Sequence, residues 1–399
     1  MNILVINSGS STVKFQVIET MDGAGDFRRQ QKLARGLVDR IGAGASYRFE
    51  GVGRSTKSGS MPVDDHEEAV RLIIRWLRSD GHELAFDAIG HRVVHGGAEF
   101  TAPVLIDDGV VKKIDALGEL APLHNPAAVG GIRAARKILG AAVPMVAAFD
   151  TSFHHTIAEP AATYAIPYEL SRRHKIRRYG FHGLAHQYDI ARYAELNGKS
   201  PKQISAVTLH LGNGCSATAI RNGQSVDTSM GFTPLEGLVM GTRSGDLDPA
   251  LVNYLARKEG ISAVAIEDML NKRSGLLGLS GLSNDMRELT AAYDANPRAR
   301  LAIDVFCHRA RKYLGAYLAA LGGAEAVIFS GGIGENSPLV RAKICAGMEW
   351  CGLALDPQLN DSVAGRDSQI SAENTSLKAY VIHTDEEAVI AWQTAALVV

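Results

Sequence analysis

A short turn rich in glycine and hydroxyl side chains occurs twice in this chain, each time between two apolar runs. Residues 7–14 (NSGSSTVK) contain the first copy, and residues 212–216 (GNGCS) contain the second. Each segment is typical of a strand, a tight turn and a second strand. Backbone N–H and hydroxyl groups in such turns point several donors at one spot, which suits a phosphate. The repetition predicts a duplicated domain that clamps a polyphosphate.

Length and charge narrow the classes of protein that fit this chain. With 399 residues it exceeds one typical core, so two domains are expected. The net charge of −1 and the hydrophobic content of 46% are ordinary for a soluble globular protein. The densest basic cluster, at residues 172–178, is interpreted as a solvated face. We therefore expect no nucleic-acid or membrane partner held by bulk charge.

The cysteines and the N-terminal residues indicate the cellular compartment of the protein. The four cysteines form no C-x-x-C pair, so neither a zinc motif nor a thioredoxin motif is present. Sparse, unpatterned cysteine is typical of a reducing compartment. The first apolar run ends at Asn7 without a charged leader, and no apolar run reaches membrane-spanning length. These features predict a cytoplasmic protein.

Strand and helix patterns alternate along the first half of the chain. A capping-box pattern at residues 64–67 precedes helical apolar spacing over residues 70–77, and Gly81 is a plausible stop. The dipeptide Asn125-Pro126 is interpreted as an N-cap and first helical residue, with the helix ending at Leu139. Buried strands are expected at residues 88–94 and 143–149. Such alternation predicts a sheet with helices against its faces, with a domain boundary near Asp150.

The second half of the chain shows the same alternation of strand and helix patterns. A meander begins at Val207, with Asn222-Gly223 as a hairpin signal. Further expected elements are a helix at 301–321, a strand at 326–329, a glycine turn at 330–336, a helix opening at Ser337-Pro338, and a final helix at 386–397. The Gly- and Ser-rich residues 42–59 are interpreted as an exposed loop or hairpin.

Three glycine or serine motifs resemble known sites without meeting their requirements. Gly212-x-Gly214 matches part of the dinucleotide fingerprint, but a hairpin follows where that fingerprint needs a helix. Residues 198–200 imitate the end of a phosphate-binding P-loop, but Tyr193 occupies the position of its first glycine. Ser11-x-x-Lys14 imitates a penicillin-binding serine site whose other elements occur in the wrong order. The remaining interpretation is a nucleotide site built from the two hairpin turns and the Gly331-Gly332 turn.

Polar residues gather at predicted strand ends, where ligands bind in open α/β sheets. Arg92 and His95 end one strand, Asp150 ends another, and His124 precedes a predicted helix. Arg243 lies in a glycine-flanked loop, and arginine suits phosphoryl oxygens because its fork is planar and always charged. A surface salt bridge is the alternative for either arginine. The pair His182 and His186 has one-face helical spacing, but it lacks the glutamate of a zinc H-E-x-x-H motif.

The chain is similar to the acetokinase family, within the superfamily of acetate and sugar kinases, Hsc70 and actin. The likeness runs nearly end to end, in eleven segments that occur in order. They are NSGSSTVK (7–14), GHRVVHGG (90–97), PLHNP (122–126), FDTSFH (149–154), YGFHG (179–183), HLGNG (210–214), DTSMGFTPLEGL (227–238), GTRSGDLDP (241–249), SGLSNDMRE (280–288), SGGIGENS (330–337) and TDEE (384–387).

This resemblance implies a fold and an activity. The fold is α/β, with two duplicated ribonuclease-H-like, actin-like domains and a cleft between them. Residues 1–150 with the terminal helix 386–399 form the first domain, and residues 151–385 form the second, nucleotide-binding domain. The activity is reversible in-line phosphoryl transfer from ATP to acetate, giving acetyl phosphate and ADP, with Mg²⁺ as cofactor and Mn²⁺ as a substitute. The family also implies a homodimer.

The resemblance further assigns roles by position. The catalytic residues are Arg92, His124, Asp150, His182 and Arg243, with Asp150 orienting the reacting groups and Arg92 also binding the substrate. The apolar pocket for the acetate methyl consists of Val94, Leu123, Phe181 and Pro234. Asn7 and Glu386 help to place the metal. ATP is bound by Lys14, His210, Leu211, Gly212, Asn213, Gly214, Asp285, Met286, Arg287, Gly331, Gly332, Ile333, Gly334 and Asn336.

Two departures and three alternative functions stay open at the level of sequence. Leu184-Ala185 replaces the Thr-Ser that commonly follows in the family, which removes two hydroxyls beside His182. Cys215 replaces a usual alanine, and it is reactive if exposed and inert if buried. The alternatives are a propionate or butyrate kinase, a pyrophosphate-dependent relative, and a non-catalytic, ATP-regulated actin-like module. One methylene in an apolar pocket discriminates between acids by only about 1–3 kcal/mol.

Overall fold

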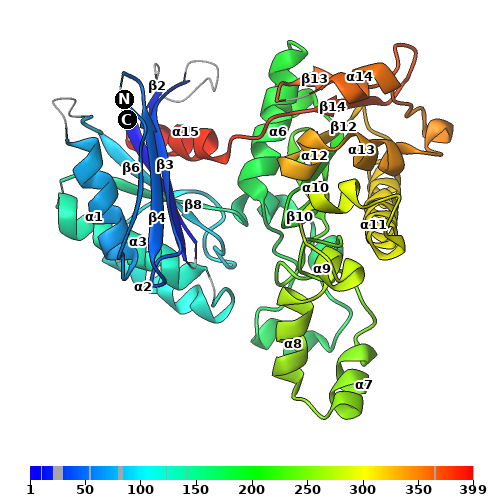
Figure 1. Cartoon of the computed structure of the whole chain (residues 1–399), viewed down its shortest axis with the longest axis horizontal. Helices are drawn as coiled ribbons and strands as arrows, with labels where there is room; N and C mark the ends of the chain where they lie inside the picture. Colours follow the sequence, from blue (N-terminus) through cyan, green and yellow to red (C-terminus); the bar gives the residue numbers. More distant parts are fainter. Residues whose placement is uncertain are drawn as a thin grey trace. The chain divides into compact units, whose positions relative to one another are not determined.

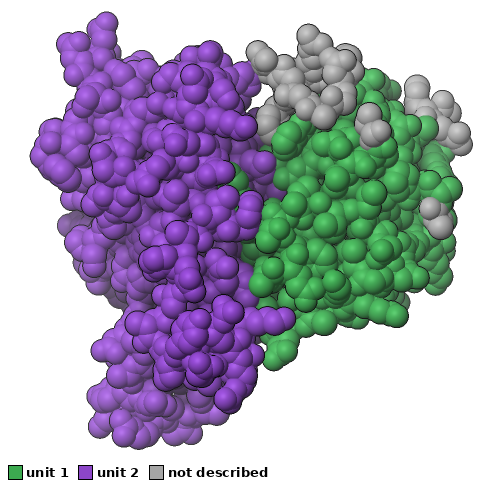
Figure 2. Space-filling model, turned by 180° about the vertical axis from the view of Figure 1, so that it is seen from behind, with its two compact units in different colours: residues 1–153, 385–399 green, residues 154–384 purple. Residues whose placement is uncertain are grey.

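The computed structural model describes residues 1–399 except 10, 21–29, 54, 80–83, 123, 141, 364 and 399. The predicted Gly81 helix stop and the pocket residue Leu123 lie outside the described residues. The chain separates into two compact units (Figures 1 and 2). Unit 1 is residues 1–153 with 385–399, and unit 2 is residues 154–384. The C-terminal segment thus returns to the unit that contains the N-terminus.

Unit 1 is built on one sheet with strand order β5-β4-β3-β2-β1-β6-β8-β7. Strands β1 to β5 pair antiparallel in sequence order, whereas β6 joins β1, and β8 joins β6, in parallel. Its elements are β1 (Asn2–Ser8), β2 (Thr12–Thr20), β3 (Gln30–Asp39), β4 (Ala45–Gly51), β5 (Lys57–Met61), α1 (His66–Leu77), β6 (Ala88–Val93), β7 (Val104–Leu105), α2 (Asp108–Ala116), α3 (Asn125–Leu139), β8 (Met145–Phe149) and α15 (Glu386–Val398).

Helices cover both faces of the parallel part of this sheet. Consecutive strand residues face opposite sides. Ile89 belongs to the core that α1 and α3 complete, and it is fully buried. A Cβ on the next residue, Gly90, would lie 2.6 Å from side-chain atoms of Ile390 and Thr394 in α15. Glycine at this position therefore lets the terminal helix approach β6 closely, which explains how residues 385–399 join unit 1.

Unit 2 contains a six-stranded sheet with order β11-β10-β9-β12-β14-β13. Helices α6 and α11 pack against its strands. The elements are α4 (Glu159–Ala162), α5 (Tyr168–Arg173), α6 (Gly183–Leu196), β9 (Ala206–Leu211), β10 (Cys215–Arg221), β11 (Gln224–Thr228), α7 (Ala250–Glu259), α8 (Ala263–Lys272), α9 (Gly275–Ser280), α10 (Met286–Ala291), α11 (Pro297–Leu321), β12 (Ala326–Ser330), α12 (Gly331–Asn336), α13 (Pro338–Cys345), α14 (Pro357–Ser362), β13 (Ser368–Gln369) and β14 (Lys378–Val381).

The two sheets share one topology. In unit 1 the run β3-β2-β1 is antiparallel and continues into parallel β6 and β8, and in unit 2 the run β11-β10-β9 continues into parallel β12 and β14. The two glycine turns occupy equivalent places, between β1 and β2 and between β9 and β10. The predicted α/β fold with duplicated ribonuclease-H-like domains is confirmed.

Local signals were informative, with two exceptions. One is the glycine turn expected at 330–336, because residues 331–336 form the short helix α12. Asn222 and Gly223 have φ values of 51° and 74°, as the predicted hairpin requires, and residues 42–59 include the β4–β5 hairpin. The prediction that Asn125 caps α3 is wrong, because His124 occupies that position. The buried Asn125 side chain instead accepts a hydrogen bond from the backbone N–H of His95 (3.1 Å) and donates one to its carbonyl (2.9 Å). Within the described ranges, no helix combines the length and apolar character needed to cross a bilayer.

Candidate active site

Three polar residues of unit 1 lie at the carboxyl ends of neighbouring parallel strands: Asn7 and Arg92 within the last two residues of β1 and β6, and Asp150 directly after β8. Ile6 of β1 is paired with His91 of β6, which places Asn7 beside Arg92. The backbone N–H of Asp150, directly after β8, donates to the carbonyl of Val93 at 3.0 Å. The parallel register thus brings together Asn7, Arg92 and Asp150, although they are far apart in sequence. This is the sheet edge at which open α/β folds bind ligands.

Arg92 is held by two carboxylates. Its Nε donates to Asp150 Oδ1 at 2.9 Å and its Nη2 donates to Oδ2 at 2.7 Å. Nη1 lies 3.4 Å from Oε2 of Glu386, at the start of α15. Burial by itself would lower the pKa of Arg92, but the charges of Asp150 and Glu386 raise it overall. Burial raises the pKa of Asp150, and the guanidinium opposes that rise. The arginine is therefore a fixed cation at this sheet edge.

The remaining predicted residues of unit 1 lie in the same part of the fold. Lys14 is the cross-strand partner of Asn7, and its side chain is exposed. Val94 directly follows β6 and is half-buried. His124 precedes α3 and is also half-buried. Two backbone hydrogen bonds to the Asn125 side chain connect the segment after β6 to the start of that helix.

In unit 2, the second glycine turn lies against two predicted catalytic side chains. A Cβ on Gly214 would lie 3.3 Å from Cε1 and Nε2 of His182 and 3.6 Å from Nη1 of Arg243. Both side chains therefore border the bare backbone of this turn. His182 is the N-cap of α6 and has a left-handed backbone, with φ of 55°. Nη1 of Arg243 donates to the carbonyl of Pro234 at 3.2 Å, and burial lowers the pKa of Arg243.

The imidazole of His182 is anchored from behind by a hydroxyl. Its Nδ1 lies 2.9 Å from Oγ of Ser216, and the same Oγ lies 2.8 Å from Nε2 of His186. Nδ1 of His186 lies 2.7 Å from Oγ1 of Thr208. Burial lowers the pKa of His186 well below its ordinary value. Both ring nitrogens of His186 thus face hydroxyls. In the part of the chain that the structure describes, no group of three or more His, Cys, Asp or Glu side chains could hold a metal ion.

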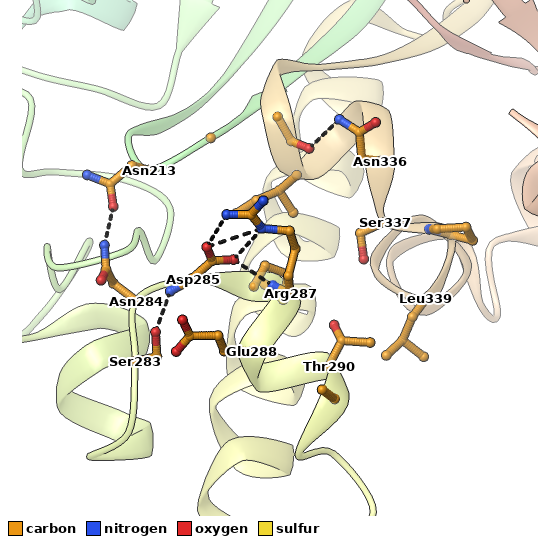
Figure 3. Close-up of a pocket in the computed structure, with 16 residues that line it drawn as sticks. Asn213, Ser283, Asn284, Asp285, Arg287, Glu288, Thr290, Asn336, Ser337 and Leu339 are labelled. Carbon is orange, nitrogen blue, oxygen red and sulfur yellow. Dashed lines mark hydrogen bonds and ion pairs between the residues drawn. The ribbon is translucent and has the colours of Figure 1, made fainter. Parts of the chain in front are cut away.

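A pocket of about 1210 Å³ opens beside the same turn (Figure 3). It contains eight of the predicted ATP-binding residues: Gly212, Asn213, Asp285, Met286, Arg287, Gly332, Ile333 and Asn336. Eight lining residues were missed: Ser283, Asn284, Glu288, Thr290, Ala291, Ser337, Pro338 and Leu339. Only their position in the sequence could have predicted these residues, because they are adjacent to the residues that were predicted. Predicted residues outside this lining are Lys14, His210, Leu211, Gly214, Gly331 and Gly334.

Polar contacts shape the walls of the pocket. Nδ2 of Asn284 donates to Oδ1 of Asn213 at 3.0 Å, which joins the turn to the segment before α10. Arg287 donates from Nε and Nη2 to Asp285, and this hydrogen bonding lowers the pKa of Asp285 to about 2. The guanidinium of Arg287 is highly exposed. Figure 3 shows these side chains on one side of the pocket and Asn336 on the other.

Helix α12 forms the second wall. Gly331 has φ of 72°, and a Cβ there would lie 2.8 Å from the carbonyl oxygen of Leu211. Nothing lies within 4 Å of the Cβ position of Gly332, so the backbone is bare where it faces the pocket. His210 at the end of β9 contacts Ser330 through Nδ1 and Oγ, which are 3.2 Å apart. Glycines therefore set both the approach of α12 to β9 and the open surface.

Two sequence departures receive an explanation. Cys215 is fully buried, and burial raises the pKa of its thiol to about 12, while the Gly212 carbonyl and Arg243 oppose the rise. Of the two alternatives that the sequence left open for this thiol, reactive or inert, the structure supports the inert one. Leu184 and Ala185 are both buried in α6, so apolar packing occupies the positions of the two missing hydroxyls. Phe181, of the predicted methyl pocket, is also buried.

Comparisons with known proteins agree over the whole chain. The Acetokinase family matches residues 2–392. The acetate kinase of Chloroherpeton thalassium is 50% identical, covering 99% of this chain and 98% of the relative, and that of Solibacter usitatus is 51% identical, covering 99% and 97%. The crystal structure of Porphyromonas gingivalis acetate kinase matches with a TM-score of 0.91 at 40% identity, covering 98% of each chain. A propionate kinase from Francisella tularensis matches with a TM-score of 0.91 at 40% identity, covering 99% of each chain.

The repeated sheet topology and these structural neighbours define a protein of duplicated actin-like ATPase domains. Such folds host unrelated functions, so the family assignment rests on the full-length sequence matches. The chain belongs to the acetokinase family, a family of phosphotransferases.

Proposed function

We propose that this chain is an acetate kinase, which transfers the γ-phosphoryl group of ATP reversibly to acetate and yields acetyl phosphate and ADP. One observation carries the proposal: the turn that borders the large pocket through Gly212 and Asn213 also borders His182 and Arg243 through Gly214. A nucleoside in the pocket would extend its phosphates along this turn toward two nitrogen donors. Full-length similarity to acetate kinases supports the choice of acceptor.

The nucleotide is bound mainly by backbone and flat surfaces. The nucleoside lies between the Asp285–Arg287 wall and the bare Gly332 backbone, with Asn336 at the same wall as Gly332. The phosphates contact the N–H groups of Asn213 and Gly214, as suits a glycine turn. The N–H of Gly212 donates to the carbonyl of Gly214 at 3.0 Å and closes the turn. The shared Asn213–Asn284 hydrogen bond keeps the turn and the nucleoside wall in register. Four further proposed residues lie on β9 and α12, which adjoin the pocket: His210, Leu211, Gly331 and Gly334. The family resemblance adds Lys14 of unit 1 as a ligand of ATP.

Catalysis consists of positioning and charge stabilisation, because phosphoryl transfer needs little covalent assistance. His182 and Arg243 donate hydrogen bonds to the equatorial oxygens of the transferring group, where negative charge is spread in the transition state. Because Gly214 has no side chain, no Cβ crowds Nε2 of His182 or Nη1 of Arg243.

Arg92 binds the carboxylate acceptor. Acetate is already ionised, so Asp150 acts as a positioner that fixes the guanidinium rather than as a general base. The family resemblance implies that the methyl group is contacted by four apolar residues, Val94, Leu123, Phe181 and Pro234. His124 assists from the start of α3.

Mg²⁺ fits the oxygen donors that unit 1 presents. Asn7 and Glu386 offer an amide oxygen and a carboxylate. Burial raises the pKa of the adjacent Glu387, and the charges of Glu386 and Asp385 raise it further, so a divalent cation at this position would relieve repulsion between carboxylates. Mg²⁺ in proteins commonly takes one or two carboxylates, substrate phosphates and waters. When bound, it supplies charge neutralisation on the nucleotide phosphates; Mn²⁺ suits the same oxygen donors.

A coupled assay for acyl phosphate tests the function. Purified protein with ATP and Mg²⁺ is expected to form acetyl phosphate and ADP in equal amounts, and to make ATP in reverse. Propionate and butyrate are assayed in parallel as alternative phosphoryl acceptors, because a propionate kinase matches the fold with a TM-score of 0.91. A higher kcat/KM for propionate than for acetate would replace the proposed substrate. Nucleotide binding without acyl phosphate from any of the three acids would favour a non-catalytic module.

The assembly and the compartment complete the proposal. We infer a homodimer, supported by apolar side chains on the exposed pair α7 and α8: Leu251, Tyr254 and Val264 are 42%, 50% and 75% exposed. Light scattering after size exclusion gives the mass directly. We infer a cytoplasmic location from the four free cysteines, which suit a reducing compartment.

A further inference from the structure

Four side chains of unit 2 form one continuous line of hydrogen-bonding atoms that ends at His182. In order they are Thr208 Oγ1, the two nitrogens of His186, Ser216 Oγ and Nδ1 of His182, with successive separations of 2.7, 2.8 and 2.9 Å. Thr208, His186 and Ser216 are each fully buried. Such a line fixes the position of every hydrogen in it once the hydrogen at one end is assigned.

The Thr208 hydroxyl sets the direction of donation for every hydrogen bond in the line. Among the residues that the structure describes, Nδ1 of His186 is the polar partner of the Thr208 hydroxyl. The hydroxyl can therefore place its hydrogen only on that nitrogen, since a buried hydrogen without an acceptor costs about 1–3 kcal/mol. Nδ1 of His186 is then an acceptor and carries no hydrogen.

The assignment propagates along the line. His186 is neutral, because burial lowers its pKa well below the ordinary value and the nearby rings of His154 and His210 act in the same direction. Its single hydrogen must lie on Nε2, which donates to Ser216 Oγ. Ser216 then directs its own hydrogen to Nδ1 of His182. A neutral imidazole that accepts at Nδ1 carries its hydrogen on Nε2.

We propose that Thr208, His186 and Ser216 are positioning residues that hold His182 as the Nε2–H tautomer, with this N–H directed toward the Gly214 turn. The inference rests on the proposed function, because a donor is useful there when a phosphoryl oxygen must be bound. Nε2 is the ring nitrogen that lies 3.3 Å from the Cβ position of Gly214. The opposite tautomer would present a lone pair to a negatively charged oxygen and repel it.

The charged and titratable groups around His182 come from several elements. His210 of β9 has its ring centroid 5.0 Å away, and Arg243 borders the same turn. Because Ser216 directs its hydrogen to Nδ1, His182 is neutral in this line, and the line sets its tautomer.

Nitrogen NMR on the full chain labelled with ¹⁵N-histidine tests the assignment, because protonated and unprotonated ring nitrogens have distinct chemical shifts. At pH about 8, where free histidine is neutral, the wild type is expected to show His182 as Nε2–H. Ser216→Ala and Thr208→Val are expected to give both tautomers in exchange, whereas Thr208→Ser keeps the hydroxyl and the wild-type pattern. Ser225→Ala is the matched control, since this buried serine contacts His154 at 2.8 Å outside the line.

Kinetics provide the second readout. Ser216→Ala is expected to lower kcat about tenfold while the KM for ATP changes less than about twofold, as loss of one oriented transition-state donor predicts. An Nδ1–H wild type, or an unchanged His182 pattern in both Ser216→Ala and Thr208→Val, would overturn the inference. An Nε2–H pattern in a protein that phosphorylates no acid would support the tautomer assignment and reject the proposed function instead.

Discussion

Arg92 and Asp150 form a two-point ion pair, with Nε to Oδ1 at 2.9 Å and Nη2 to Oδ2 at 2.7 Å. Their side chains are 18% and 2% exposed, so little water competes for either contact. Parallel hydrogen bonds of this kind fix the plane of the guanidinium as well as its position. A carboxylate that binds Arg92 therefore meets a cation that is already oriented.

Replacing Asp150 with asparagine removes this orientation at nearly constant volume. Asp150→Asn is expected to lower kcat/KM for acetate about 100-fold, because a misplaced donor forfeits electrostatic stabilisation of the transition state. Steady-state acyl phosphate assays measure the change. Asp115→Asn is the control, since Asp115 pairs with Arg133 at 2.9 Å on the surface and is expected to be nearly neutral. Equal effects of both variants would contradict the positioning role.

Gly214 tests the space beside the proposed donors. In Gly214→Ala the new methyl would lie 3.3 Å from Nε2 of His182, where a phosphoryl oxygen is proposed to bind. We expect a fall in kcat of about 10- to 100-fold with little change in melting temperature, because a misplacement of the reacting groups is costly. Gly315→Ala is the control, because nothing lies within 4 Å of its Cβ position in α11. That control is expected to gain about 0.5–1 kcal/mol of stability and to keep its activity.

Among the described residues, Arg341 is the largest fully buried side chain, and it donates hydrogen bonds to the backbone of α12, which lines the pocket. Nη1 donates to the carbonyls of Gly334 and Glu335 at 2.9 Å each, and Nε donates to Oδ1 of Asn360 at 2.8 Å. Burial lowers the pKa of Arg341 to about 10, so the side chain stays charged at neutral pH.

Arg341→Met leaves these buried acceptors without donors. The free energy of unfolding in urea is expected to fall by about 2–5 kcal/mol, and calorimetry is expected to show weaker ATP binding. Arg298→Met is the control, because Arg298 donates to the carbonyl of Leu279 at 3.0 Å in an exposed setting where water can replace it. Unchanged ATP affinity in a folded Arg341→Met protein would refute a role in shaping the pocket.

The burial of His91 predicts that the native protein loses stability as the pH falls. Burial lowers its pKa to about 3, and its Nε2 has no hydrogen-bond partner among the described residues. The unfolded chain therefore binds more protons than the native state below pH about 6.5, so stability falls as pH decreases through that value. His91→Gln is expected to flatten this slope by up to about 1.4 kcal/mol per pH unit. Urea unfolding at pH 7, 6 and 5 measures it, and identical slopes for both proteins would contradict the prediction.

Cys215 is expected to resist alkylation in the native protein. With a thiol pKa raised to about 12, the reactive thiolate is scarce at neutral pH, and the side chain is fully buried. Mass spectrometry after iodoacetamide should find label first on Cys351, the one cysteine that is partly exposed. Rapid native labelling of Cys215 that saturating ATP does not slow would contradict its buried placement beside the turn.

The sequence alone predicted most of the architecture and many of the residues of the pocket. Local rules sufficed for the Asn222-Gly223 hairpin, since turn chemistry depends on neighbouring residues. The resemblance pointed to Asp285 and Gly332 in the pocket, but not to Pro338 or Leu339, which line it because α13 follows α12 closely. Asn125 was misjudged because a tertiary partner, the His95 backbone, outcompetes capping of its own helix.

What the sequence determined by itself is the repeated strand–turn–strand unit, and with it the duplicated fold, because apolar alternation and glycine turns act over a few residues. Only the tertiary structure decided which groups orient the proposed catalytic side chains. Glu386 lies near Arg92 because α15 returns to unit 1. Ser216 reaches His182 because α6 packs against β9, and β10, which carries Ser216, pairs with β9. Hydrogen bonds require separations near 3 Å and correct direction, and between residues distant in the chain only packing sets both.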